Sequence, residues 1–229
     1  MRPYDAVLLD IDGTLVDSND AHAHAWVEAF AQHGIKVAFE RVRRMIGMGG
    51  DRVIEQITGW PRDDRKVQPL EDQHTKIFIE RWLRHVRPID KTRDFVLRLR
   101  REGYQLALAS AAHEDVLNPL LEIAGIADLI DDKAKPPKPE ESKPDPATIE
   151  VALSRVDADR SRVLMIGDTP YDIEAARAAR VDALCFTTGG YSPEELRGTI
   201  AVYRGPADLL AHWDESPLGS AASMPTLHP

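Results

Sequence analysis

An apolar run at residues 6–9 ends in two aspartates, Asp10 and Asp12, and Gly13 follows them directly. Side chains at positions i and i+2 of a strand point the same way, so both carboxylates can face one site at the strand's C-terminal end. Open parallel sheets bind their ligands at that end. An aspartate there can attack phosphorus as a nucleophile, and a carboxylate close to it can serve as general acid and base.

The spacing of apolar residues predicts an α/β fold. Four runs have the pattern of strands, at residues 6–10, 104–109, 163–166 and 183–187. Helix-like segments separate the last three, which predicts βαβ units and a parallel sheet. The stretch between the first two strands lacks a strand pattern, and helices are expected there at 19–33, 40–46, 51–58 and 70–85. We therefore expect a Rossmann-like parallel-sheet core with an inserted α-helical cap.

The same pattern predicts domain boundaries. Residues 1–17 and 89–213 are assigned to the core, and residues 18–88 to the cap. The Lys- and Pro-rich stretch 131–146 is expected to be an extended loop. Beyond Trp213 the sequence turns polar, small and proline-containing, so residues 214–229 are predicted to form a disordered tail.

Composition excludes several classes of protein. With 229 residues, 43% of them hydrophobic, the chain is typical of a soluble globular protein. A net charge of −9 argues against a general nucleic-acid or anionic-membrane binder. The cap segment 18–88 is mildly basic (12 Lys/Arg, 10 Asp/Glu), which suits an anionic substrate. The single cysteine, Cys185, lies in an apolar run and is expected to be a core residue. No signal-peptide pattern or bilayer-length apolar run is evident, so the expected location is cytoplasmic.

Four motifs in order carry a resemblance to a known family. The segment Asp10-Ile11-Asp12-Gly13-Thr14-Leu15-Val16-Asp17-Ser18 resembles the opening motif of the haloacid dehalogenase-like superfamily, whose members are mostly Mg²⁺-dependent phosphatases. Ser110 closes the run 106–109 like the second motif, and Lys143 stands in Ser-Lys-Pro-Asp-Pro like the third. Gly167-Asp168-Thr169-Pro170-Tyr171-Asp172 is similar to the fourth. One match would be weak, but four in order over residues 5–190 are specific.

The resemblance implies a catalytic and metal-binding set. Asp10 is expected to be the nucleophile and a ligand of Mg²⁺, while Asp12 is the general acid and base and binds the metal through its main-chain carbonyl. Asp168 is expected to be a further ligand, and Asp172 to bind through water or to orient Asp168. Dehalogenases and phosphonatases of the superfamily lack a carboxylate at the position of Asp12, so its presence here points to phosphate esters. Arg180 stands where the family usually ends the last-motif helix with glycine.

The resemblance also implies a phosphate-binding set. Ser110 would offer its hydroxyl, with backbone N–H groups such as that of Ala111 beside it at a helix N-terminus. Ser110 can at the same time be the N-cap of that helix. Lys143 would screen the phosphate and the carboxylates from one another. Thr14 would cover the phosphate through its backbone or its hydroxyl, and Gly13 would permit the tight turn and close approach.

The cap contributes a glycine-rich segment, Gly47-Met48-Gly49-Gly50-Asp51-Arg52. It is not a nucleotide P-loop, because no Gly-Lys-Ser/Thr follows. Two interpretations stay open: an ordinary helix end and loop, or a substrate-selecting loop with Gly49 and Gly50 over the site and Arg52 on a second anionic group. The pair His22 and Trp26 is similar to a feature of some sugar-phosphate mutases. Related phosphatases also carry a histidine there, and an exposed helix histidine is the commonest explanation of His22.

The predicted function is Mg²⁺-dependent hydrolysis of a small phosphomonoester through a phosphorylated Asp10, similar to phosphoglycolate phosphatases. A sugar-phosphate mutase of the β-phosphoglucomutase type is the alternative. A non-catalytic phosphate-binding protein is a third possibility, against which the intact set of site residues argues. The expected partner is a small phosphorylated metabolite; phosphoglycolate, sugar phosphates and nucleoside monophosphates all stay open, as does the oligomeric state.

Overall fold

The computed structural model describes residues 2–110, 112, 114–130 and 147–219. Within them, five parallel strands form one sheet in the order β4-β1-β5-β6-β7. The strands are β1 (Ala6–Leu9), β4 (Gln105–Leu108), β5 (Val163–Gly167), β6 (Asp182–Phe186) and β7 (Ala201–Tyr203). Leu9 lies opposite both Leu108 and Ile166, so β4, β1 and β5 end together at one edge of the sheet. The predicted α/β fold is confirmed.

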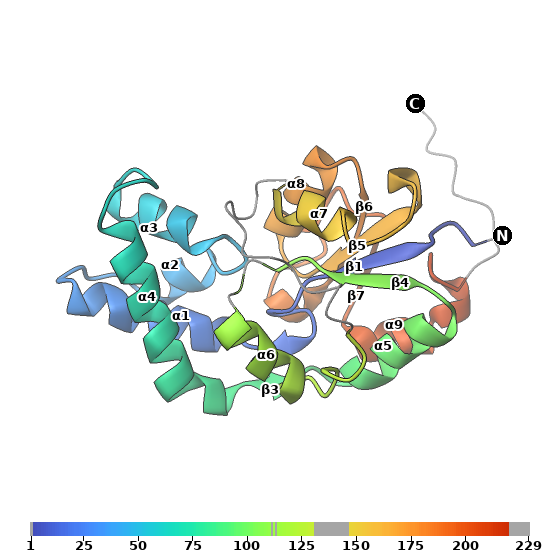
Figure 1. Cartoon of the computed structure of the whole chain (residues 1–229), viewed down its shortest axis with the longest axis horizontal. Coiled ribbons are helices and arrows are strands. Elements are labelled where there is room, and N and C mark those ends of the chain that lie inside the picture. The colour runs from blue at the N-terminus through green and yellow to red at the C-terminus, as the bar shows by residue number, and fades with distance from the viewer. Residues whose placement is uncertain (1, 111, 113, 131–146, 220–229) are drawn as a thin grey trace.

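The sheet is buried on both faces because its strands are apolar at successive positions. Val7 and Leu9 of β1 face one hydrophobic cluster, whereas Ala6 and Leu8 face a second. The first cluster is covered by α5 (Thr92–Arg101), α6 (Glu114–Ile123) and α9 (Pro206–Ala211). The second is covered by α7 (Ala147–Leu153) and α8 (Pro170–Ala178). Figure 1 shows α7 and α8 above the sheet and α5 and α9 below it, the three-layer arrangement of a doubly wound fold.

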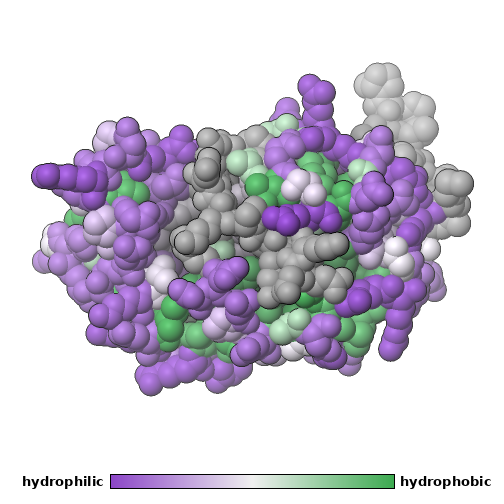
Figure 2. All heavy atoms as spheres, in the orientation of Figure 1, coloured by the Kyte–Doolittle hydropathy of each residue, from purple (hydrophilic) through white to green (hydrophobic). Residues whose placement is uncertain are grey.

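A helical insert lies between β1 and β4 and forms the cap, drawn in blue to teal at the left of Figure 1. Its elements are α1 (Asn19–Gln32), α2 (Phe39–Arg43), α3 (Gly50–Thr58), α4 (Val67–Ile77), the π-helix η1 (Phe78–Trp82) and the 3₁₀ turn η2 (Leu83–His85). Trp26, Phe30 and Leu70 are buried between them. Figure 2 shows hydrophilic side chains over most of the visible face of the cap, so its apolar residues point inward.

A two-stranded antiparallel ribbon joins the cap to the core. β2 (Val16–Asp17) pairs with β3 (Arg87–Pro88), with Val16 opposite Pro88 and Asp17 opposite Arg87. The chain therefore leaves and re-enters the core at adjacent points. Each strand has only two residues, which is too short for a period-two pattern to reveal it in the sequence.

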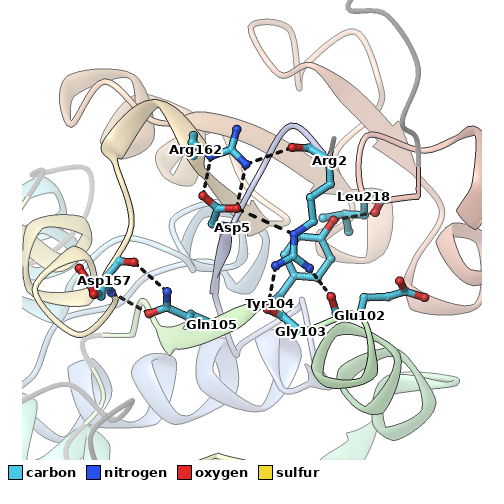
Figure 3. Close-up of polar contacts among 9 residues, drawn as sticks. All are labelled: Arg2, Asp5, Glu102, Gly103, Tyr104, Gln105, Asp157, Arg162 and Leu218. Carbon is cyan, nitrogen blue, oxygen red and sulfur yellow. Dashed lines mark hydrogen bonds and ion pairs between the residues drawn. The ribbon is translucent and has the colours of Figure 1, made fainter.

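The N-terminal edge of the sheet is held by polar contacts (Figure 3). The Arg162 guanidinium donates to the Asp5 carboxylate, with Nη2 2.8 Å from Oδ1. The Gln105 side chain donates to the carbonyl of Asp157 at 2.8 Å and accepts from its N–H at 2.7 Å. These contacts join the starts of β1, β4 and β5, on the edge opposite the aspartates of the sequence motifs.

Two details of the sequence prediction differ from the structure. β7 was not predicted, because its three half-buried residues are too few to give a strand signal. The tail was predicted to begin at residue 214, yet Leu218 is buried and its carbonyl accepts from the Tyr104 hydroxyl at 2.6 Å. The predicted start of the tail is therefore too early. Residues 220–229, and the predicted extended loop 131–146, lie outside the described residues.

Two further observations concern single features of the chain. Cys185 is fully buried in β6, which confirms its prediction as a core residue. In the described part of the chain, every helix is too short or too polar to cross a bilayer.

Candidate active site

The C-terminal edge of the sheet gathers the motif residues. Asp10 follows β1, Ser110 lies two residues beyond β4, and Asp168 follows β5. The backbone N–H of Asp10 still donates to the Ile166 carbonyl at 2.9 Å, so the strand ladder holds its Cα in place. Parallel strands carry their C-terminal groups to one edge, which explains how positions more than 150 residues apart meet.

Three buried carboxylates lie together at this edge. One oxygen each from Asp10, Asp168 and Asp172 lies within 4.8 Å of the others, and their residues are 7%, 0% and 1% exposed. Burial, and next the negative charges of Asp10 and Asp172, raise the pKa of the Asp168 carboxyl well above its usual range. Like charges in a dry site repel strongly, so this arrangement needs a positive charge or protons to offset it.

Two uncharged side chains orient the cluster. The Thr14 hydroxyl lies 3.1 Å from Asp10 Oδ2 and 3.0 Å from Asp168 Oδ1, and bridges the two carboxylates. The Asn19 amide donates to Asp168 Oδ2 at 3.0 Å. The Thr14 backbone N–H bonds to the Ile11 carbonyl at 3.3 Å. The Thr14 hydroxyl thus contacts carboxylates here, and its predicted contact with phosphate stays a prediction.

Asp172 is fixed by the start of α8. Its Oδ2 accepts from the Thr169 hydroxyl at 2.7 Å and from the Thr169 N–H at 3.1 Å, and the two residues form a capping box. The Asp168 N–H also donates to it at 3.3 Å. Pro170, at the start of the helix, has no backbone N–H and so leaves no donor without a partner there. The start of α8 therefore orients the Asp172 carboxylate toward the backbone N–H of Asp168.

Glycines make room for the carboxylates. A Cβ on Gly13 would lie 2.1 Å from Asp168 Oδ2, and one on Gly189 would lie 2.2 Å from the same atom. Gly13 has a positive φ of 79°, which confirms its predicted role in a tight turn and close approach. A Cβ on Gly167 would lie 2.5 Å from Asp172 Cγ. At these three positions any larger residue would displace a carboxylate.

The cluster fits a divalent cation. Carboxylate oxygens are the hard ligands that Mg²⁺ and Ca²⁺ prefer, and a doubly charged ion would offset the repulsion among the three groups. Asn19 Oδ1 is buried without a hydrogen-bond partner beside the cluster, an acceptor that a hydrated ion would satisfy. The residues that could hold the ion are Asp10, Asp168 and Asp172.

Asp12 lies slightly apart from the three and faces the cap. Its Oδ1 accepts from the Ser18 hydroxyl at 2.5 Å and lies 3.1 Å from His22 Nε2. The Asp12 side chain is 23% exposed, so it borders a space that substrate and water can enter. Since an ionised carboxylate only accepts, Nε2 of His22 carries the proton in this contact.

His22 continues into an aromatic wall of the cap. Its Nδ1 lies 3.3 Å from His74 Nε2, and its ring stacks on Phe78 with centroids 3.9 Å apart. The His74 ring stacks on Trp26 at 4.0 Å. Desolvation, and next the neighbouring His22, lower the pKa of His74 well below its usual range, so its ring is neutral near pH 7. Contacts therefore run without a break from Asp12 into α4.

A cavity of about 190 Å³ lies between core and cap. Asp10, Asp12 and Ser110 line its core side, and His22, Gly49 and Gly50 are on its cap side. The Ser110 hydroxyl also accepts from the Ala112 N–H at 3.1 Å, which is compatible with the predicted capping role. Arg52 is not among the described residues that line the cavity, whereas the sequence suggested it there. Lys143 and Ala111, both predicted to bind phosphate, lie outside the described residues.

The cap also contacts the core through residues that do not line the cavity. The carbonyl of Arg44 accepts from the hydroxyls of Tyr171 and Tyr191 at 2.9 and 2.7 Å. The Arg44 guanidinium lies 4.3 Å from the centre of the Tyr191 ring and pairs with Glu195. We call this group of four residues the Arg44 latch. It holds the C-terminal end of α2 against the core.

Several residues of the site were not identified from the sequence. Asn19 was expected only as the first residue of a cap helix. Ser18 is the N-cap of α1, so Asn19 lies in the first turn, from where its amide reaches Asp168. Gly189 follows β6, and its position after a strand was the signal that could have found it. His74 and Glu71 carry no such signal, because their place depends on how α4 packs in the cap.

Comparison with known proteins agrees with this geometry. A family model described as haloacid dehalogenase-like hydrolase matches residues 7–186. An N-acetylmuramic acid 6-phosphate phosphatase of Pseudomonas aeruginosa is 29% identical over 83% of this chain and 84% of its own. A phosphoglycolate phosphatase of Rhodospirillum rubrum is 29% identical over 89% and 88%. The crystal structure of a hydrolase from Pseudomonas syringae superimposes with a TM-score of 0.82 at 27% identity, covering 92% of this chain and 98% of its own.

Proposed function

The chain belongs to the haloacid dehalogenase-like hydrolases, and from this premise we propose that it is a Mg²⁺-dependent phosphatase that hydrolyses a small phosphomonoester through a phosphorylated Asp10. One observation carries the proposal. Asp10 and Asp12 line a single cavity, and the carboxylate of Asp10 also belongs to the buried cluster with Asp168 and Asp172. A nucleophile, an acid–base group and a cation site are thus available at one place.

The two aspartates divide the chemistry. An Asp10 oxygen attacks phosphorus, the ester P–O bond breaks, and the leaving oxygen takes a proton from Asp12. In the second step Asp12 takes a proton from water as the water oxygen attacks phosphorus, and the bond to Asp10 breaks to give inorganic phosphate. His22 and Ser18 hold the Asp12 carboxylate by hydrogen bonds during both proton transfers.

The metal and phosphate contacts complete the proposed site. Asp10, Asp168 and the carbonyl of Asp12 would hold Mg²⁺, and Asp172 would bind it through water or orient Asp168; the ion would supply positive charge to offset that of the phosphate oxygens. Ser110, the backbone of Ala111, Lys143 and Thr14 bind the phosphate. Two observations support this set: Ser110 lines the cavity beside Asp10, and Thr14 contacts Asp10 directly.

The cap controls access. In this proposal residues 18–88 move as one unit on the ribbon of β2 and β3, and residues 1–17 with 89–213 form the stationary core. Closure excludes bulk water while the ester is cleaved, and reopening releases the products. The short ribbon supports this role, because only two pairs of residues connect the cap to the core there.

Phosphate release from a panel of esters tests the proposal. The purified protein is incubated with p-nitrophenyl phosphate and with metabolite phosphomonoesters, in Mg²⁺ or in EDTA. We expect release of phosphate in Mg²⁺, its loss in EDTA and its return when Mg²⁺ is restored. Absence of turnover across the panel in Mg²⁺, or turnover that EDTA leaves unchanged, contradicts the proposal.

A further inference from the structure

The cap wall of the cavity carries acidic and neutral polar groups. The helix α4 supplies most of them, and Trp26 of α1 adjoins them: the α4 residues are Gln68, Glu71, Asp72, His74 and Thr75. His74 is neutral near pH 7 because its pKa is lowered. Among the described residues that line the cavity there is no lysine or arginine. The wall that meets the alcohol part of a substrate is therefore negative or uncharged.

Glu71 is the most constrained of these groups. Its Oε1 lies 2.6 Å from where a Cβ on Gly50 would be, so the glycine at the start of α3 lets the carboxylate approach that helix. Burial, and next the charges of Asp51 and Asp72, raise the pKa of Glu71 to about 7, and a backbone hydrogen bond at Asp51 opposes the rise. The charges that act on Glu71 are thus carboxylates, not cations.

Asp72 adds a second carboxylate at the mouth of the cavity. It is exposed, and its Oδ1 accepts from the Gln68 amide at 2.9 Å, one turn away on the same helix. Together the Gln68 amide, the Thr75 hydroxyl and the two carboxylates present both acceptors and donors. A ligand with several hydroxyl groups can bond to all of them.

Four arginines of the cap form ion pairs with carboxylates that do not line the cavity. Three arginines pair with carboxylates of the cap itself: Arg43 with Asp20 at 2.6 Å, Arg81 with Glu28 at 2.6 Å and Arg62 with Asp51 at 3.5 Å. Arg44 pairs with Glu195 of the core. The mildly basic composition of the cap therefore does not make a basic cavity, although the sequence alone suggested an anionic partner.

On the premise of the proposed phosphatase function, we infer that the substrate is a phosphomonoester of an uncharged, hydroxyl-bearing alcohol, and that Glu71 and Asp72 exclude esters with a second anionic group. A second carboxylate or phosphate would enter the cap side of the cavity beside like charges and lose its hydration without a partner. Hydroxyl groups would donate to the same carboxylates. The inference makes phosphoglycolate and sugar bisphosphates poor substrates, and so disfavours the mutase alternative.

A pair of esters matched in size tests the inference. Glycerol 3-phosphate and 3-phosphoglycerate share the phosphate and the carbon chain, and differ in a terminal hydroxymethyl or carboxylate group. For each we measure kcat/KM in Mg²⁺, or its inhibition constant against p-nitrophenyl phosphate if it is not turned over. We expect the neutral ester to be preferred by at least about 30-fold, since like-charge contacts discriminate strongly. A ratio near one, or preference for the carboxylate ester, overturns the inference.

Variants locate the origin of the preference. Glu71→Gln keeps the shape and a hydrogen-bonding group but removes the charge, so the ratio of kcat/KM for the neutral ester over the carboxylate ester should fall about tenfold. Asp72→Asn should reduce this ratio less, because solvent screens an exposed charge. Glu80→Gln is the matched control, because Glu80 is an exposed cap residue that does not line the cavity. Its ratio should equal that of the wild type. An unchanged ratio in both Glu71→Gln and Asp72→Asn also overturns the inference.

The pH dependence of the ratio gives a second readout. The two esters share their phosphate and the catalytic groups, so titration of those groups cancels. Because the pKa of Glu71 is about 7, the preference for the neutral ester should grow between pH 6 and pH 8. The charged groups that act on Glu71 are Asp51 of α3 and Asp72 of α4, and Trp26 of α1 lies beside the same glycine, Gly50, that Glu71 approaches. In Glu71→Gln the ratio should stay flat; an equal rise in this variant contradicts the role of Glu71.

Failure of this inference differs visibly from failure of the proposed function. If p-nitrophenyl phosphate is hydrolysed in Mg²⁺ but the carboxylate ester is preferred, the phosphatase function stands and the substrate class is wrong. If p-nitrophenyl phosphate and every other ester are left intact, the phosphatase function fails and the inference falls with it.

Discussion

At the scale of single residues, the geometry of the carboxylate cluster depends on two glycines, because a glycine has no Cβ atom. Gly13 and Gly189 approach Asp168 Oδ2 from two loops, and neither could carry a Cβ without moving that oxygen. Of the two, Gly189 is the cleaner probe, because its φ is not in the left-handed region and only the space around it opposes a side chain.

Gly189→Ala should therefore weaken metal binding, because its Cβ would meet both the Asp168 carboxylate and, at 2.7 Å, the Asp168 main-chain carbonyl oxygen. The added methyl group would displace the Asp168 carboxylate, and misplacement of a site group by about 1 Å costs on the order of 100-fold in rate. We expect kcat/KM to fall by about that factor, with a raised Mg²⁺ concentration for half-maximal activity. Circular dichroism checks that the variant is folded. Wild-type Mg²⁺ dependence in a folded variant would show that the cluster is not the metal site.

Glu71 allows a test of stability against pH. Its folded pKa of about 7 lies above the value of 4.5 for an unperturbed glutamate. The folded state therefore binds more protons than the unfolded state between these values, and stability falls as pH rises through this window. Glu71→Gln removes this loss, so the variant should gain about 1–2 kcal/mol in free energy of unfolding at pH 8 and little at pH 4. Urea unfolding of the wild type and of Glu71→Gln at pH 4 and pH 8 measures this gain. An equal gain in free energy of unfolding at the two pH values would contradict the raised pKa of Glu71.

At the scale of elements, long periodic segments were predicted well and short ones were not. The helix expected at 51–58 is α3, and the helix expected at 19–33 is α1. The helix expected at 70–85 begins earlier, as α4, and changes to a π-helix and a 3₁₀ turn after Ile77. Period alone cannot distinguish these forms, because all three place side chains three to five residues apart on one face.

Arg180, which follows the C-cap residue of α8, has a strained backbone conformation. Arg180 has a φ of 57°, and the Val181 N–H bonds to the Ala176 carbonyl at 2.9 Å, as in a Schellman motif. This is the position where the family usually has glycine. Arg180→Gly should raise the free energy of unfolding by about 0.5–1 kcal/mol, because a left-handed conformation costs a residue with a Cβ. Thermal unfolding measures the gain, and Arg177→Gly in the helical part of α8 should destabilise instead. A loss of stability in Arg180→Gly would contradict this account.

At the scale of the whole molecule, the ribbon and the Arg44 latch are two of the contacts that join the cap to the core. The ribbon of β2 and β3 is the covalent connection, and the Arg44 latch is a polar contact on another part of the cap. The cavity lies between the two units. If the cap moves on the ribbon as proposed, the latch must break for the cavity to open, so we expect the latch to limit access to the site.

Arg44→Ala should therefore favour the open cap. The variant removes the ion pair with Glu195 and the contact with the Tyr191 ring, which in exposed positions are together worth about 1 kcal/mol, or about fivefold in the open population. We expect amide hydrogen exchange in α2 to accelerate by about that factor and KM to rise. Lys36→Ala, an exposed cap residue outside the latch, is the control. Exchange rates equal to the wild type would show that the latch does not restrain the cap.

Much of the site followed from the sequence because strand ends converge by topology. Asp10, Asp12, Ser110 and Asp168 each follow an apolar run, and a parallel sheet brings such ends together. The cap side could not be predicted in the same way. His74 and Glu71 reach the cavity only through the packing of α4 against α1, and Arg52 is not among the described residues that line the cavity, whereas Gly49 and Gly50 are. Helix packing inside an insert leaves no local signature in the sequence.

The most direct test of the central claim is the turnover number of Asp10→Asn with p-nitrophenyl phosphate at saturating Mg²⁺. The amide keeps the size of the side chain and removes the nucleophile, so kcat should fall by at least about 1,000-fold in a protein that still unfolds cooperatively. Asp90→Asn, at an exposed core position, should keep the wild-type value. Turnover by Asp10→Asn within a few-fold of the wild type would contradict catalysis through a phosphorylated Asp10.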